Sequence, residues 1–133
     1  MVVVDTNIVA YLLIDGDRSR EARTLLARDP DWRSEAFVLV EFSNLLATYV
    51  RAGALARDRA RGLLNEAQSR LRVLITVPHG RALDIAAEFA VSAYDARFIA
   101  AAQGLGARLV TEDARLRAAA PALTRSLAET LAA

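Results

Sequence analysis

Short apolar runs alternate along this chain with longer segments of helical apolar spacing, and this alternation limits the fold more than any other feature. The apolar runs lie at Val2–Val4, Trp32–Ser34, Leu71–Val77 and Leu109–Thr111. Between them, apolar residues recur every three or four positions, which predicts helices. A helix between two strands can serve as the crossover connection that parallel strands need, so this alternation favours parallel pairing. The sequence therefore predicts an α/β fold with a short parallel sheet covered by helices.

The helical segments share an apolar stripe and end at a turn residue or a change in polarity. Ser19 is expected to cap the second helix, Gly53 follows the third, and Leu123–Leu127 is expected to add an edge strand. The chain has 133 residues and shows no linker or repeat, which predicts a single domain over residues 1–133. The expected helices are Ile8–Leu13, Arg20–Arg28, Glu35–Arg51, Arg57–Leu71, Arg81–Ala90, Tyr94–Gln103 and Asp113–Ala119.

The composition excludes several classes of chemistry. The chain has no cysteine, which excludes disulfides, a thiolate nucleophile and a cysteine-ligated metal. All 17 basic side chains are arginine, so a Schiff-base lysine and a P-loop lysine are excluded as well. Against these stand 16 acidic side chains, and the net charge of +1 neither indicates nor excludes nucleic-acid binding.

The first residues do not form a targeting signal. No basic segment precedes the apolar run, and Asp5 and Asn7 interrupt it. Nothing reaches the length of a membrane span. We therefore expect a cytoplasmic protein without a membrane partner.

Two acidic residues follow predicted strands. Asp5 comes directly after Val2–Val4, and Asp113 follows Leu109–Thr111 with one residue between. A parallel sheet gathers such positions at one edge, where ligands of α/β proteins bind. Each residue is also a good N-cap for the helix that follows it, and taken singly each is better explained by capping.

Two further acids lie on apolar helix faces. Glu41 is flanked at helical spacing by Phe37, Val38 and Leu45, and Asp95 by Val91, Phe98 and Ile99. A buried carboxylate without a partner costs several kcal/mol or takes up a proton. The structural alternatives are a salt bridge to an arginine of another helix for Glu41 and a favourable helix-dipole position for Asp95.

Taken together, these four acids indicate a metal site. Two carboxylates about 4 Å apart repel each other by roughly 4 kcal/mol at an effective dielectric constant of ~20. A divalent cation would remove this repulsion, and a set of oxygen ligands favours Mg²⁺ or Mn²⁺. An acidic metal site without a protein nucleophile suggests phosphodiester hydrolysis.

The same residues carry a family resemblance that covers nearly the whole chain. V-D-T-N after the first strand, the isolated Glu41, S-A-Y-D-A at residues 92–96 and G-A-R-L-V-T-E-D at residues 106–113 resemble a PIN-domain ribonuclease. The opening D-T-N-I-V-A-Y-L-L resembles in particular the VapC-type toxins of bacterial type II toxin–antitoxin systems. The resemblance implies a three-layer α/β/α fold.

The resemblance also implies roles for individual residues. Asp5, Glu41, Asp95 and Asp113 would form the catalytic acidic cluster that binds the metal. Thr6, Asn7, Ser92 and Thr111 would be polar neighbours that orient carboxylates or water, and the T-x-D pattern favours Asp113 over Glu112. Arg97 departs from the family pattern, and either it pairs with a neighbouring acid or it contacts the substrate phosphate.

The implied activity is Mg²⁺- or Mn²⁺-dependent endonucleolytic cleavage of tRNA, rRNA or mRNA. The implied partners are a second copy of the chain and a cognate antitoxin whose tail enters the active-site groove. Two alternatives remain: a housekeeping nuclease without a toxin role, and a catalytically inactive binding module. Receiver domains and haloacid-dehalogenase-like phosphatases are set aside, because both need a lysine and the latter also needs D-x-D after the first strand.

Overall fold

Five short strands form one parallel sheet in the computed structural model, which describes all residues from Met1 to Ala133. The strand order is β3-β2-β1-β4-β5, and every neighbouring pair is parallel. β1 lies at the centre, so the chain moves outward to β2 and β3 and then crosses to β4 and β5. The strands are β1 (Val2–Val4), β2 (Trp32–Glu35), β3 (Leu71–Ile75), β4 (Leu109–Val110) and β5 (Thr124–Arg125).

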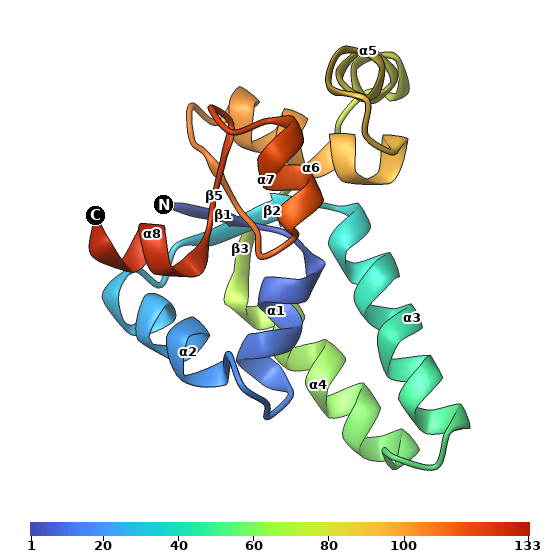
Figure 1. The fold of residues 1–133 in the computed structure, drawn as a ribbon. Coiled ribbons are helices and arrows are strands. Elements are labelled where there is room, and N and C mark those ends of the chain that lie inside the picture. Colours follow the sequence, from blue (N-terminus) through green and yellow to red (C-terminus); the bar gives the residue numbers. More distant parts are fainter.

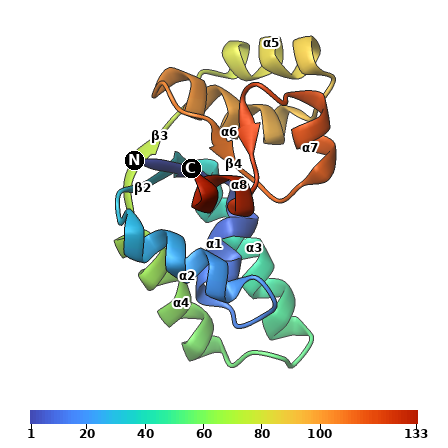
Figure 2. The ribbon, with the colours of Figure 1, turned by 60° about the vertical axis from the view of Figure 1, so that its left-hand side comes forward.

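Helices cover both faces of the sheet. In Figures 1 and 2, α1 to α4 lie on one side of it, and α5, α6 and α7 lie on the other. This arrangement is the predicted three-layer α/β/α fold. The helices are α1 (Thr6–Leu13), α2 (Ser19–Arg28), α3 (Phe37–Arg51), α4 (Arg57–Arg70), α5 (His79–Phe89), α6 (Ala93–Gly104), α7 (Ala114–Ala119) and α8 (Leu127–Ala132).

One hydrophobic core joins the three layers. It contains 31 buried residues, and the central strand β1 is buried along its whole length, as expected for a strand covered on both faces. Phe42 of α3 and Phe98 of α6 enter this core from opposite sides of the sheet. The two helices that carry Glu41 and Asp95 are therefore anchored by apolar neighbours of those acids. No helix is long and apolar enough to span a membrane.

Three details differ from the predicted elements. Glu35 ends β2 instead of starting a helix, and α3 begins at Phe37. Ser19 is the first residue of α2 rather than its cap, and its hydroxyl accepts from Gly16 N and donates to the Ile14 carbonyl. The predicted edge strand is present as β5, and it is followed by a helix that was not predicted, α8, which begins with a capping box of Ser126 and Glu129.

Candidate active site

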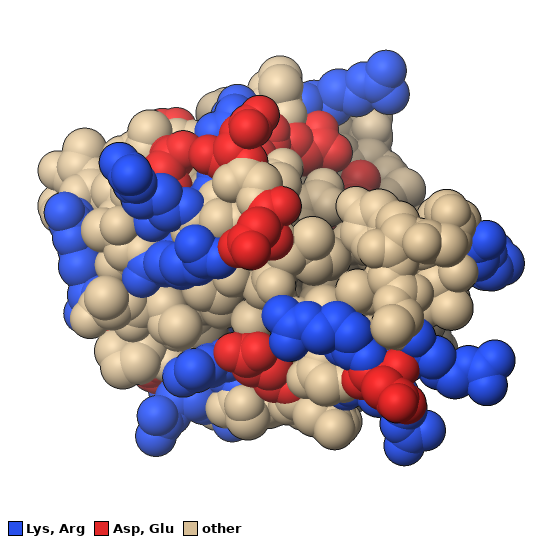
Figure 3. All heavy atoms as spheres, turned by 90° about the horizontal axis from the view of Figure 1, so that it is seen from below, with Lys and Arg blue, Asp and Glu red and all other residues tan.

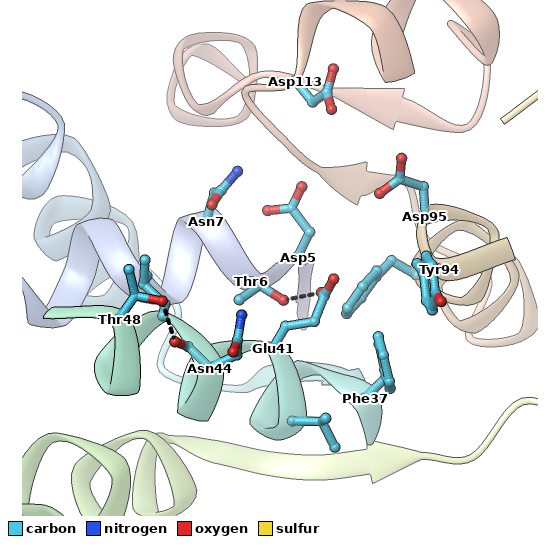
Figure 4. A pocket seen from close by; sticks show the side chains of 13 residues that line it. Asp5, Thr6, Asn7, Phe37, Glu41, Asn44, Thr48, Tyr94, Asp95 and Asp113 are labelled. Atoms are coloured by element: carbon cyan, nitrogen blue, oxygen red, sulfur yellow. Dashed lines mark hydrogen bonds between the residues drawn. The ribbon is translucent and has the colours of Figure 1, made fainter. Parts of the chain in front are cut away.

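A pocket of about 610 Å³ opens at the carboxyl edge of the sheet, where the chain order switches between β1 and β4. All four acids named from the sequence line it, each from a different element (Figure 4). Asp5 follows β1, Glu41 lies on α3, Asp95 lies on α6, and Asp113 follows β4. The other lining residues are Thr6, Asn7, Phe37, Val40, Asn44, Leu45, Thr48, Tyr94 and Phe98.

Asp5 is the most deeply buried of the four, with 8% of its surface exposed. It is the N-cap of α1, and its Oδ1 accepts a hydrogen bond from Ile8 N at 3.3 Å. Burial, together with the charges of Asp95 and Asp113, raises the pKa of Asp5 to about 7. The Thr111 side chain and the Ile8 N–H act in the opposite direction. Its surroundings therefore disfavour the charged form, which a bound cation would stabilise.

Glu41 faces Asp5 across the pocket and is held by the neighbouring helix. The Thr6 hydroxyl of α1 donates to Glu41 Oε1 at 2.6 Å, as Figure 4 shows. Burial raises the pKa of Glu41, the Thr6 hydrogen bond opposes this rise, and the charge of Asp95 adds to it. The salt bridge to an arginine that would have explained Glu41 structurally is not present.

Asp95 and Asp113 complete the acidic lining from the opposite helix layer. Asp95 lies in the first turn of α6, where Asp95 N donates to the Ser92 hydroxyl at 3.0 Å. Burial raises the pKa of Asp95, with the Ser92 hydrogen bond opposing and the charge of Asp113 adding. Asp113 N donates to Thr111 Oγ1 at 3.1 Å, so Thr111 lies between Asp5 and Asp113.

Capping and pocket lining are compatible at the two strand ends. Asp113 caps α7 through Oδ1, which accepts from Arg115 N and Leu116 N, and Asp5 caps α1 through its own Oδ1. Both residues nevertheless line the pocket. Capping of a helix therefore does not exclude a role for either residue in the pocket.

The pocket concentrates negative charge without a basic side chain in its lining. Its oxygen donors suit a hard divalent cation such as Mg²⁺ or Mn²⁺. No three acidic or imidazole side chains are spaced to hold a metal ion by themselves. This spacing still fits Mg²⁺, which usually binds one or two carboxylates and completes its shell with water and substrate phosphate.

A family model described as PIN domain matches residues 2–121, which is most of the chain. The chain belongs to the PIN-domain family. The family resemblance of the sequence is thereby confirmed.

The relatives of this PIN domain agree in fold and extent. Ribonuclease VapC3 of Pyrobaculum aerophilum is 28% identical over 125 residues, covering 91% of this chain and 95% of that protein. The crystal structure of PAE2754 from the same organism superposes with a TM-score of 0.79 at 22% identity, covering 97% of this chain and 90% of that one. A toxin–antitoxin complex from Klebsiella pneumoniae gives a TM-score of 0.67 at 21% identity, covering 94% and 97%.

Arg97 forms an ion pair with Glu35, which is the structural one of its two predicted roles. It lies outside the lining of the PIN-domain pocket. Its Nη1 donates to Glu35 Oε2 at 2.9 Å and to the Val77 carbonyl at 2.8 Å, and its Nη2 contacts His79 Nδ1. Glu112 also turns away from the pocket, because it pairs with Arg18 and Arg117.

Sequence reasoning missed several residues that share the pocket with the acids. Asn44 and Thr48 lie one and two turns beyond Glu41 on the same side of α3, a spacing that is visible in the sequence. Phe37 and Tyr94 stack on each other beside the acids, with ring centroids 5.5 Å apart. No sequence pattern connects these two aromatic residues, because they come from helices on opposite sides of the sheet.

Proposed function

We propose that this PIN domain is a Mg²⁺- or Mn²⁺-dependent endoribonuclease that acts as the toxin of a toxin–antitoxin pair. The observation that carries the proposal is the convergence of four carboxylates, from four separate elements, in one pocket whose lining has no basic side chain. Ribonuclease VapC3 and the Klebsiella pneumoniae toxin–antitoxin complex support the same assignment through their names and their similarity to this chain.

Some residues of the pocket would bind the cation, and others would hold the cation-binding side chains in position. Asp5, Glu41, Asp95 and Asp113 would hold the divalent cation, with Thr6 fixing Glu41 through its hydrogen bond. When bound, the cation lowers the pKa of a water molecule and stabilises charge on the phosphate as the bond breaks. Ser92 and Thr111 would keep Asp95 and Asp113 in place, and Asn7 and Asn44 would offer amide groups to water or substrate.

The acidic pocket also defines the partners that we propose. An RNA strand brings phosphates to a bound cation, whereas an antitoxin would neutralise the carboxylates directly with a basic side chain. The fully retained set of four acids disfavours an inactive binding module. We further propose that the chain acts as a homodimer, as expected from the family, which sedimentation of the purified protein tests.

Nuclease activity is tested by cleavage of a structured RNA in Mg²⁺ or Mn²⁺, comparing the wild type with Asp5→Asn and Asp95→Asn. Both substitutions are expected to abolish cleavage, and EDTA is expected to abolish it in the wild type. Arg33→Gln, which alters a partly exposed ion pair away from the pocket, serves as the control and is expected to cleave normally. Full activity in both acid variants, or in EDTA, would disprove the mechanism.

The toxin role is a separate claim and has a separate test. Expression of the wild-type chain is expected to arrest growth, and co-expression of the neighbouring open reading frame is expected to restore it. Asp5→Asn should not arrest growth. A nuclease that cleaves RNA in vitro without arresting growth would be a housekeeping enzyme instead.

A further inference from the structure

Two aromatic rings stack at the mouth of the acidic pocket. The rings of Phe37 and Tyr94 have centroids 5.5 Å apart and are inclined by 13°, and both residues line the pocket (Figure 4). Tyr94 is 62% exposed, although Phe37 covers part of one face. The stack therefore offers an open aromatic surface beside the carboxylates.

The stack is built from two residues that adjoin two of the acids along the chain. Tyr94 directly precedes Asp95 in α6, and Phe37 lies one helical turn before Glu41 in α3. Side chains one turn apart on a helix have Cβ atoms roughly 5–6 Å apart. Because Phe37 is one turn from Glu41 and the Tyr94 ring stacks on Phe37, we expect a base attached to a phosphate at the carboxylates to reach the Tyr94 ring.

A buried ion pair holds the two rings in place. Glu35 Oε1 accepts from Phe37 N at 2.6 Å, and Glu35 Oε2 accepts from Arg97 Nη1 at 2.9 Å. Arg97 lies one turn after Tyr94 on α6, so the ion pair joins the start of α3 to α6 close to the two rings. A surface that is fixed before binding loses little freedom when a ligand stacks on it.

Few basic side chains lie near the acids, so an aromatic surface there would add to the affinity for a nucleic acid. No arginine lines the pocket, and on the face shown in Figure 3 arginine and acidic side chains are interspersed, without one continuous basic patch. Contacts to phosphate alone are thus sparse next to the acids. Stacking of bases on aromatic side chains is the other main source of affinity for single-stranded nucleic acid.

We propose that Tyr94, supported by Phe37, is the platform on which the base next to the scissile phosphate stacks. The inference rests on the proposed ribonuclease activity and deepens it. It requires the base next to the cut to be unpaired, because only an unpaired base can turn outward onto an aromatic ring.

The test uses a single-stranded RNA oligonucleotide whose cleavage site has been mapped, with versions that carry an abasic ribose on either side of the cut. Tyr94→Leu is expected to raise KM about tenfold with kcat retained, the pattern of a lost uniform binding contact. Tyr94→Phe should behave as wild type. Leu83→Ala removes a side chain that is 64% exposed but lies outside the pocket, and it should also behave as wild type.

The abasic substrates identify the contact. At one of the two positions, the abasic substitution should raise KM of the wild type about as much as Tyr94→Leu does with intact RNA. For the Tyr94→Leu protein, that abasic RNA and the intact RNA should have the same KM. Equal abasic effects in wild type and Tyr94→Leu would overturn the proposal. So would dissociation of a dimer by Tyr94→Leu with base dependence unchanged, which would make the ring a protein-contact surface.

Binding measurements separate this inference from the activity on which it rests. Fluorescence anisotropy with the Asp5→Asn protein, alone and combined with Tyr94→Leu, compares the intact and abasic oligonucleotides without cleavage. Tighter binding of the intact strand that disappears with Tyr94→Leu supports the platform, and its persistence refutes it. Absence of cleavage by the wild type counts against the proposed function only.

Discussion

Glu35 and Asp5 are buried carboxylates at the ends of neighbouring strands. Glu35 has a basic partner within the chain, and Asp5 has none. Glu35 ends β2 with 2% of its surface exposed, and Asp5 follows β1 with 8% exposed. Glu35 accepts from Phe37 N, from Val77 N and from the Arg97 guanidinium. Asp5 has no basic partner, and two further carboxylates, Asp95 and Asp113, raise its pKa.

The difference separates an acid that stabilises the fold from acids that serve a ligand. A buried carboxylate with a guanidinium and two N–H donors has its charge compensated within the protein. Burial raises the pKa of Asp5 to about 7, so its environment disfavours the charged form. We infer that the compensating charge for Asp5 comes from outside the chain.

The largest expected effect is on catalysis. Asp5→Asn removes a ligand charge from the proposed metal site and is expected to lower kcat/KM for RNA cleavage by about 10³-fold, equivalent to ~4 kcal/mol of barrier. Arg97→Met, which removes the partner of Glu35, is expected to leave more activity than Asp5→Asn. Circular dichroism is used to show that both proteins are folded. Similar losses in both variants would remove the distinction between the two acids.

The ion pair at Glu35 should matter most for stability. Arg97→Met leaves a buried carboxylate without its cation and is expected to lower the free energy of unfolding by about 3–5 kcal/mol, measured by urea denaturation. The double variant Glu35→Gln with Arg97→Met removes both charges and should recover much of this loss. If the two single losses simply add in the double variant, the pair does not interact as the structure indicates.

Replacing the carboxylate by an amide should stabilise the metal-free protein at Asp5 and destabilise it at Glu35. The raised pKa means that folded Asp5 keeps its proton between about pH 4 and 7, where the unfolded chain has released it. Stability without metal therefore falls as pH rises through this window, by up to about 4 kcal/mol. Asn keeps the N-cap, so Asp5→Asn should stabilise the metal-free protein at pH 8 and have little effect at pH 4.

Thermal unfolding in EDTA at the two pH values measures this difference, with Glu35→Gln as the matched comparison. Glu35→Gln is expected to destabilise the chain at pH 8, because it leaves Arg97 without its anion. Mg²⁺ should raise the melting temperature of the wild type more than that of Asp5→Asn. A lower melting temperature for Asp5→Asn at pH 8 would contradict the assigned burial cost.

The sequence predicted the parallel sheet and the four acids through local patterns. Asp5 and Asp113 could be found because they follow apolar strands, and Glu41 and Asp95 because their helical neighbours are apolar. Glu35 could not, because its partners Val77 and Arg97 lie 42 and 62 positions away. The Phe37–Tyr94 stack is likewise created by the packing of two helix layers. The capping box of α8 was a readable signal that was overlooked.

The smallest expected effect tests how finely the pocket orients its acids. Thr6→Val removes the hydroxyl that donates to Glu41 Oε1 at 2.6 Å while keeping a side chain of similar shape. Losing a hydrogen bond to a metal-binding carboxylate typically costs 10- to 100-fold in metal affinity or activity, and we expect the lower end, about tenfold. Thr6→Ser keeps the hydroxyl and should retain activity. A titration of cleavage rate against Mn²⁺ distinguishes the causes, because a disordered Glu41 should raise the Mn²⁺ concentration needed for half-maximal rate, whereas a general loss of folding should lower the rate at every concentration.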